Sequence, residues 1–388
     1  LAAFLFVSTF STNTFADIKM GIILGFTGPI ESLTPAMAAS AELAFKEASD
    51  SGSLLGGQSI AVERADSTCV DSAAATSAAE GLVSGGVVAI MGADCSGVTG
   101  AIATNVAVPN GVVMISPSAT SPGLTDLADN GYFFRTAPSD ARGGQILADI
   151  TKDRKIKSVA ITYTNNDYGK GLADVYAGAV EAHGIKVTAM AAHEDGKADY
   201  SAEIATLASA GGDAVAVIGY LDQGGKGIIQ GSLDSGAFDT FVLSDGMIGD
   251  TLTDAFGNDL NKSFGSLPGS TGKGANVFAD VAKAAGIDSS GPYTGESYDA
   301  AALITLAMQA GGKADRATVQ QNVMAVANAP GTKIYPGELK KALDLLAKGK
   351  AVDYEGATGV NLTEVGEAEG SFLEKEIKGG KFSTKKQR

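Results

Sequence analysis

The strongest constraint on the fold of this chain is a strict alternation of short apolar runs with helical patterns. From Ile18 onward, each β-branched run is followed by an Ala-rich stretch with apolar residues at helical spacing. Parallel strands that are buried on both faces have such near-continuous apolar sequences, and helices connect them. The alternation therefore predicts an α/β fold built from right-handed βαβ units in doubly wound parallel sheets.

The alternation falls into two series, which predict two lobes. In the first series we expect strands at 18–24, 59–65, 87–91 and 112–116, and helices at 36–49, 71–83 and 98–106. In the second series, which follows Phe133–Thr136, we expect strands at 159–163, 185–191, 214–218 and 241–243, and helices at 139–151, 169–183, 200–209 and 223–235. Helices at 275–285 and 297–310 should return to the first lobe, and 359–362 with 371–377 should form a terminal antiparallel hairpin.

These elements divide the chain into two discontinuous lobes. The first lobe is expected to comprise 17–137 and 268–330, and the second 138–267 and 331–388. The chain would then cross between the lobes three times, near Thr136, Leu267 and Pro330, which predicts a three-segment hinge.

The beginning of the chain predicts export. Residues 1–16 are uncharged, with an apolar core, a Ser/Thr stretch and a small residue, Ala16, at the end. We interpret them as the remnant of a secretory signal peptide, rather than as a first strand or a membrane anchor. The apolar core is shorter than the roughly 20 residues that span a bilayer. The mature protein is therefore expected to begin near Asp17 and to be periplasmic and soluble.

Net charge argues against some binding partners, and the cysteine and histidine content argues against a metal site. The formal net charge is −15, from 29 basic and 44 acidic residues, which disfavours nucleic acid and anionic membranes. Cys69 and Cys95 are expected to form a disulfide in an exported chain, the alternatives being free thiols or metal ligands. Only His183 and His193 could add imidazole ligands, and we expect them at the surface or at helix ends, so no metal site is predicted.

No enzymatic motif emerges from the sequence. The run Gly25–Gly28 lacks the third glycine of a dinucleotide-binding loop and precedes Pro29. A phosphate-binding loop, a nucleophile elbow and a zinc-binding helix motif are all missing, and no nucleophile and base stand together at the predicted strand ends. We therefore expect neither an enzyme nor a cofactor; a hydrolase or an oxidoreductase on the same scaffold is the disfavoured alternative.

Polar residues at the predicted strand ends indicate a binding crevice instead. Ser96, Ser118 and Thr120 follow strands of the first lobe, where their hydroxyls suit a carboxylate. Asp245 is the one acid among the strand ends of the second lobe and suits an ammonium group. Singly, such residues are helix caps or turn residues. Together they lie where open α/β sheets bind ligands, and they predict a site for a free amino acid.

Several runs of residues resemble a known family. They are 17–19, Thr27–Pro29, the cysteine pair with Ser96, Met114–Thr120, Asp167–Leu172, Gly219–Tyr220 and Gly291–Tyr293. In these runs the chain resembles the leucine/isoleucine/valine-binding proteins of bacterial ABC importers, over essentially its whole mature length. The resemblance implies the type I periplasmic binding protein fold, with two doubly wound parallel-sheet lobes joined by a three-segment hinge.

The resemblance also implies roles for individual residues. Ser96, Ser118 and Thr120 would hold the carboxylate and part of the ammonium group, with Ala119 as a wall. The remaining candidates are Tyr220 on the opposite side, Tyr168 and Tyr293 at the side-chain pocket, and Glu296 beside it. Two positions depart from the family pattern: Asp245 stands where a glutamate is common, and Leu33 where an aromatic residue often covers the ligand.

These expectations combine into one function. The chain would be a monomeric, extracytoplasmic solute-binding protein that closes on leucine, isoleucine or valine and delivers it to the permease subunits of an ABC importer. Aromatic or small amino acids and related carboxylates stay open as ligands. The alternative is a sensory protein that binds an amino acid or a small carboxylate and signals through a separate receptor.

Overall fold

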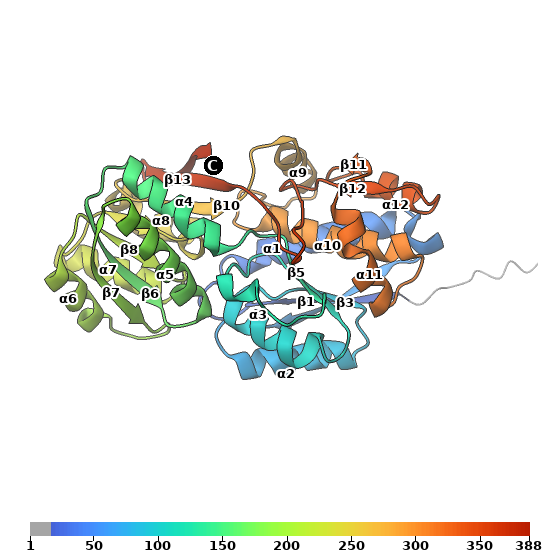
Figure 1. Ribbon diagram of the computed structural model, residues 1–388, viewed down its shortest axis with the longest axis horizontal. Helices are drawn as coiled ribbons and strands as arrows, with labels where there is room; N and C mark the ends of the chain where they lie inside the picture. The colour runs from blue at the N-terminus through green and yellow to red at the C-terminus, as the bar shows by residue number, and fades with distance from the viewer. Residues whose placement is uncertain (1–16) are drawn as a thin grey trace, which may run out of the picture.

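The apolar runs of the first series form one parallel sheet in the computed structural model, which describes residues 17–388. Its order is β2-β1-β3-β4-β5, and its strands are β1 (Ile18–Leu24), β2 (Ile60–Asp66), β3 (Ala89–Gly92), β4 (Val113–Ser116) and β5 (Phe133–Arg135). Helices α2 (Ser72–Ser84) and α3 (Ser96–Ile102) cover one face, and α1 (Thr34–Asp50) covers the other (Figure 1). The leader expected at 1–16 lies outside the described residues.

The second series forms a mixed sheet of order β14-β13-β10-β9-β8-β6-β7. Its parallel strands are β6 (Ser158–Thr164), β7 (Lys186–His193), β8 (Ala214–Ile218), β9 (Phe241–Leu243) and β10 (Phe264–Pro268). The helices of this lobe are α4 (Asp140–Asp153), α5 (Asp167–Ala182), α6 (Ser201–Ala210), α7 (Gly224–Ser235) and α8 (Asp250–Phe256). Both lobes thus have the expected α/β architecture.

The end of the chain departs from the predicted hairpin. Strand β13 (Phe372–Lys378) pairs antiparallel with β10 and with β14 (Lys381–Gln387), and not with residues 359–362. Gly379 and Gly380 have positive φ angles of 58° and 71°, which lets them form the tight turn between β13 and β14. The hairpin therefore lies one strand further along the chain than the sequence pattern indicated.

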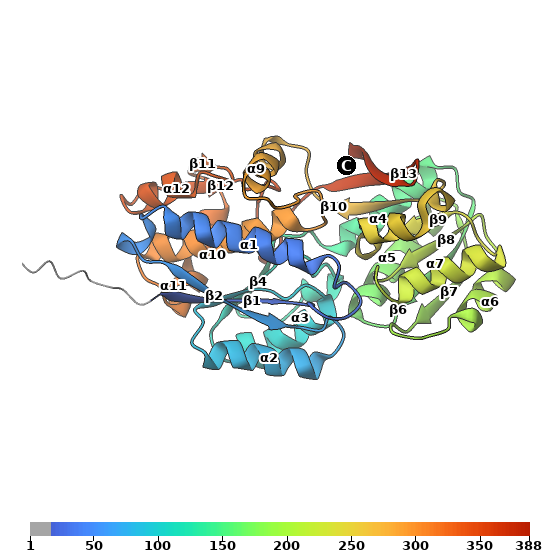
Figure 2. The same cartoon turned by 180° about the vertical axis from the view of Figure 1, so that it is seen from behind.

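Residues after Pro330, which were expected in the second lobe, remain in the first lobe before they reach this hairpin. They include β11 (Thr332–Ile334), α12 (Leu339–Leu346) and β12 (Val352–Tyr354), which lie with α9 (Lys273–Ala284), α10 (Thr294–Gly311) and α11 (Arg316–Ala327) in the first lobe (Figure 2). The Tyr354 hydroxyl donates a 2.9 Å hydrogen bond to Asp299 of α10, which lies beside α1. We therefore place the third crossing at residues 362–371 instead of near Pro330.

Three chain segments connect the lobes and hydrogen-bond to one another. They are the segment that follows β5, the one that follows β10 and residues 362–371. The Arg135 amide donates to the Gly366 carbonyl at 3.0 Å, and the Gly269 amide donates to the Ser371 carbonyl at 2.9 Å. These backbone hydrogen bonds join the three crossing segments to one another, so that together they form the hinge region.

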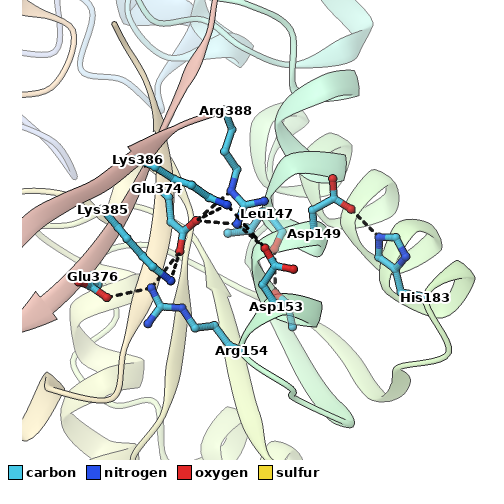
Figure 3. Close-up of polar contacts among 11 residues, drawn as sticks. Leu147, Asp149, Asp153, Arg154, His183, Glu374, Glu376, Lys385, Lys386 and Arg388 are labelled. Atoms are coloured by element: carbon cyan, nitrogen blue, oxygen red, sulfur yellow. Dashed lines mark hydrogen bonds and ion pairs between the residues drawn. The ribbon is translucent and has the colours of Figure 1, made fainter. Parts of the chain in front are cut away.

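A buried acid anchors the C-terminal hairpin to the second lobe. The Glu374 side chain of β13 is fully buried and accepts hydrogen bonds from Arg154 at 3.0 Å and from the terminal Arg388 at 2.6 Å (Figure 3). Arg388 also reaches Asp153 at the end of α4. Among residues 17–388, no helix has both the length and the apolarity that a membrane span requires.

Candidate ligand-binding site

The carboxyl ends of the strands in the two lobes face a common cavity of about 30 Å³. A cavity of this size has room for about two water molecules. Its walls come from both lobes and are formed by Ile30, Leu33, Met37, Asp94, Cys95, Ser96, Ser118, Tyr168, Tyr220, Asp245, Gly246 and Tyr293. Seven of the predicted site residues are among them: Leu33, Ser96, Ser118, Tyr168, Tyr220, Asp245 and Tyr293.

The first lobe contributes two serine hydroxyls from adjacent strand ends. Ser96 begins α3 directly after β3, and its hydroxyl oxygen accepts a 3.1 Å hydrogen bond from the Ser121 amide. The Ser118 hydroxyl donates to the Asp94 carbonyl at 3.1 Å. Cys95 is disulfide-bonded to Cys69, which ties the start of α3 to the loop after β2. The hydrogen bonds of the two serines and the neighbouring disulfide therefore fix the position of both hydroxyl groups.

The second lobe contributes Asp245, whose two carboxylate oxygens are both hydrogen-bonded. Tyr168 donates to Oδ1 at 2.7 Å, and Tyr293 donates to Oδ2. Tyr293 begins α10 of the first lobe, so its bond spans the cleft between the lobes. Burial raises the pKa of Asp245, while the two tyrosine hydroxyls stabilise its anion and oppose that rise. Tyr168 stacks on Tyr220 with ring centroids 5.2 Å apart.

Two further buried acids near the cavity were not predicted from the sequence. Asp94 lines the cavity and accepts hydrogen bonds from the amides of Gly25 and Cys95 and from the Ser67 hydroxyl. Asp140 lies behind Asp245, and both border a smaller space of about 10 Å³. Burial, followed by the charge of Asp245, raises the pKa of Asp140 well above its usual range. Asp94 lies two residues after β3 and Asp140 begins the helix after β5, so strand-end position was the available signal.

Three predicted residues lie outside the cavity wall. Ala119 and Thr120 are buried in the turn after Ser118, and the Thr120 hydroxyl has no hydrogen-bond partner among the described residues. Glu296 borders a separate hinge cavity of about 280 Å³, which Tyr293 also lines. Glu296 therefore lines only the hinge cavity, while Thr120 is buried two residues after Ser118 of the first cavity's wall.

The two histidines lie away from the cavity. His183 is at the C-terminal end of α5, as expected, and its Nε2 lies 2.7 Å from Asp149. His193 is not at the surface: it is buried beside Thr162, and burial lowers its pKa to about 4. The part of the chain that the structure describes contains no cluster of His, Cys, Asp and Glu side chains arranged as metal ligands.

Two α/β lobes, a three-segment hinge and a small buried cavity between opposed strand ends are the features of a two-lobed small-molecule binding protein. Comparison with known proteins agrees with this class. Residues 17–342 match the family model described as periplasmic binding protein. The chain therefore belongs to the periplasmic binding protein family, as the resemblance in its sequence indicated.

Two relatives with similar sequences are both named as Leu/Ile/Val-binding protein homologs. Leu/Ile/Val-binding protein homolog 1 of Brucella melitensis is 31% identical over 315 residues, which are 80% of this chain and 82% of that protein. The match to homolog 3 of the same organism is 32% identical and spans 56% of this chain, but only 58% of that relative's length.

Solved structures confirm the type I fold. The leucine binding protein LivK from Thermotoga maritima has a TM-score of 0.80 at 21% identity and covers 95% of this chain and 98% of its own. LivJ from Streptococcus pneumoniae, in complex with isoleucine, has a TM-score of 0.78 at 22% identity, with 96% and 99% covered. A solute binding protein from R. palustris, in complex with benzoate, has a TM-score of 0.76 at 19% identity, with 96% of each chain covered.

Proposed function

We propose that this chain is the solute-binding protein of an ABC importer and that it captures a free amino acid, preferably leucine, isoleucine or valine. The proposal rests on the cavity walls, which offer hydroxyl groups on one side and a carboxylate on the other. Ser96 and Ser118 offer hydroxyls to a carboxylate, and Asp245 faces them with a carboxylate of its own. Ile30, Leu33 and Met37 supply an aliphatic wall for an apolar side chain.

The charge around the cavity favours an ammonium-bearing ligand over a simple carboxylate. Its wall includes Asp94 and Asp245, with Asp140 behind them, and it contains neither lysine nor arginine. A ligand whose only charge is negative, such as benzoate, would meet acidic side chains and no cation in this wall. An amino acid brings a compensating positive charge. The names of the relatives and the isoleucine-bound similar structure support the same ligand class.

Binding requires the lobes to move. A space for about two water molecules is too small for leucine. Periplasmic binding proteins close around their ligands by hinge motion. The three connected crossings provide such a hinge here, and Tyr293, which contacts Asp245 across the cleft, would separate from it on opening.

A thermal-shift screen against the common amino acids, benzoate and 4-hydroxybenzoate tests the proposal, because a ligand that binds only the folded state raises the melting temperature. We expect the largest shifts with leucine, isoleucine and valine, and dissociation constants in the micromolar range, equivalent to about −8 kcal/mol, by titration calorimetry. Shifts with the benzoates alone would refute the amino-acid assignment. Ligand-dependent capture of ABC permease subunits would separate an importer component from a sensor.

A further inference from the structure

Asp140 is a buried acid without a charged partner of its own. It is only 3% exposed, and its Oδ2 has no hydrogen-bond partner among the described residues. The buried Thr120 hydroxyl lies beside it and opposes the rise in the pKa of Asp140, although it has no hydrogen bond of normal geometry in the described part of the chain. Buried polar atoms are nearly always hydrogen-bonded, and unsatisfied ones in a native site call for an explanation such as a bound group. Asp140 therefore keeps one carboxylate oxygen with which it can accept a hydrogen bond from a ligand.

The space between Asp140 and Asp245 has the dimensions of a single small group. Both acids border a cavity of about 10 Å³, together with the hydroxyl-bearing Ser244 and Ser266. This volume holds about one water molecule, and an ammonium group is of similar size. Asp245 also lines the larger cavity between the lobes, so it separates the two spaces and belongs to both.

The charged and titratable groups that face Asp140 leave its negative charge largely uncompensated. Asp245 borders the same space, and the charge of Asp140 also raises the pKa of Tyr168 and Tyr293; none of these three groups carries positive charge. Arg135 is the nearby cation, but its guanidinium group is engaged by Glu367 and by the carbonyls of Ala119 and Ser121. Two carboxylates in one buried space cannot both ionise without a large cost, so the ligand-free pair retains a proton.

We propose that Asp140 is a second acid of the ammonium subsite, and that a bound ammonium group displaces a proton which Asp140 and Asp245 hold in the ligand-free protein. One positive charge replaces another in the same space, and the proton passes to the solvent. This inference depends on the proposed capture of an amino acid. It makes binding proton-linked: affinity rises with pH as long as the free pair is still protonated.

Titration calorimetry with leucine, isoleucine and valine, in buffers of different ionisation enthalpy, measures the protons released. Wild-type protein should release up to one proton for each ligand bound. Its dissociation constant should fall by as much as tenfold for each pH unit while the pair holds the proton. Asp140→Asn should abolish both effects and bind more weakly than wild type at high pH. Asp129→Asn, a matched change at an acid outside the cavity, should retain both.

The outcomes separate this inference from the proposed function. Binding of these amino acids with no proton release by wild type, or with the same release by Asp140→Asn, would overturn it and leave the function intact. If none of the three binds in the thermal screen, both fail. If Asp140→Asn does not fold, Asp245→Asn provides the second test. It leaves Asp140 without its acidic neighbour, so the pH window of proton release should move to lower pH, and an unmoved window counts against the pairing.

Discussion

At the scale of single residues, Asp245, the proposed partner of the ligand ammonium, has a carboxylate that two tyrosines hold in place. Tyrosine hydroxyls occupy one position on each carboxylate oxygen, which fixes the orientation of the group and leaves further acceptor positions on both oxygens. The Asp245 side chain is one methylene shorter than the glutamate that, by the family resemblance, is common at this position. The neighbouring Asp140 supplies additional negative charge behind it.

Removal of this carboxylate should weaken amino-acid binding severely. We expect Asp245→Ala to cost on the order of 3 kcal/mol of binding free energy, because the ligand ammonium would be buried without its main partner. Titration calorimetry measures this cost, and Asp129→Ala serves as a control outside the cavity. Wild-type affinity in the Asp245 variant would exclude this residue from the site.

A substitution at Thr120 can show whether its hydroxyl contacts the ligand or only supports the fold. Its buried hydroxyl has no hydrogen bond of normal geometry among the described residues and only opposes the rise in the pKa of Asp140, so Thr120→Val should change the free energy of unfolding of the ligand-free protein little. If the hydroxyl binds the ligand, as the family resemblance implies, the same variant should lose about 1 to 3 kcal/mol of binding free energy. Urea unfolding and calorimetry measure the two quantities. Unchanged binding would show that Thr120 serves packing alone.

At the scale of secondary-structure elements, the sequence predicted the strands that carry the site because they are strongly apolar and are followed by helices. The runs at 18–24, 214–218 and 241–243 coincide with β1, β8 and β9. Strand β10 escaped prediction because it contains Gly265 and ends in Pro268, both of which weaken a strand pattern. Residues 332–354 stay in the first lobe because of contacts with α10, which periodicity cannot reveal.

For the site, too, the sequence predicted what depends on strand ends and not what depends on tertiary packing. Strand-end position located Ser96, Ser118, Tyr220 and Asp245 around one cavity, because parallel strands bring their carboxyl ends together. It could not show that Glu296, one helical turn after Tyr293, borders a different cavity. That outcome depends on the tertiary position of α10 between the ligand cavity and the hinge.

Helix α10 places Glu296 in this hinge cavity, where its titration should affect stability. Burial raises the pKa of Glu296 to about 8, so the folded protein binds its proton more tightly than the unfolded chain, in which the pKa is near 4.5. The associated stability is therefore present below pH 4.5 and is lost progressively as the pH rises to about 8. Lys375 borders the same cavity, and burial lowers its pKa.

Glu296→Gln removes this titration while it preserves the shape of the side chain. The stability of the variant relative to wild type should increase by about 1 kcal/mol per pH unit between pH 5 and 7.5. Urea unfolding at a series of pH values measures the difference, with Glu80→Gln, on the exposed face of α2, as the matched control. A difference that does not vary with pH would mean that Glu296 is ionised in the folded protein.

At the scale of the whole molecule, hydrogen bonds join the two lobes directly and away from the ligand cavity. The Asp222 amide, after β8, donates to the Pro29 carbonyl of the first lobe at 2.9 Å, and the Asp222 carboxylate accepts from the Ser32 amide at 2.9 Å. Ser121 of the first lobe donates to the Asp167 carbonyl at the start of α5. If the lobes open as proposed, these contacts break, so they would favour the closed form without touching the ligand.

Asp222→Ala should therefore weaken binding although Asp222 does not line the ligand cavity. Loss of its carboxylate removes a hydrogen bond that exists only in the closed form, at a cost of about 0.5 to 1.5 kcal/mol, and the dissociation constant should rise about 2- to 10-fold. Spin labels on α2 and α6 should report longer distances in the ligand-free variant than in wild type, and equal distances once an amino acid is bound. Asp234→Ala on the outer helix α7 controls for charge. If ligand-free distances and affinity both match wild type, the contact at Asp222 contributes nothing to closure, and the equilibrium depends on the hinge and on the bond between Tyr293 and Asp245.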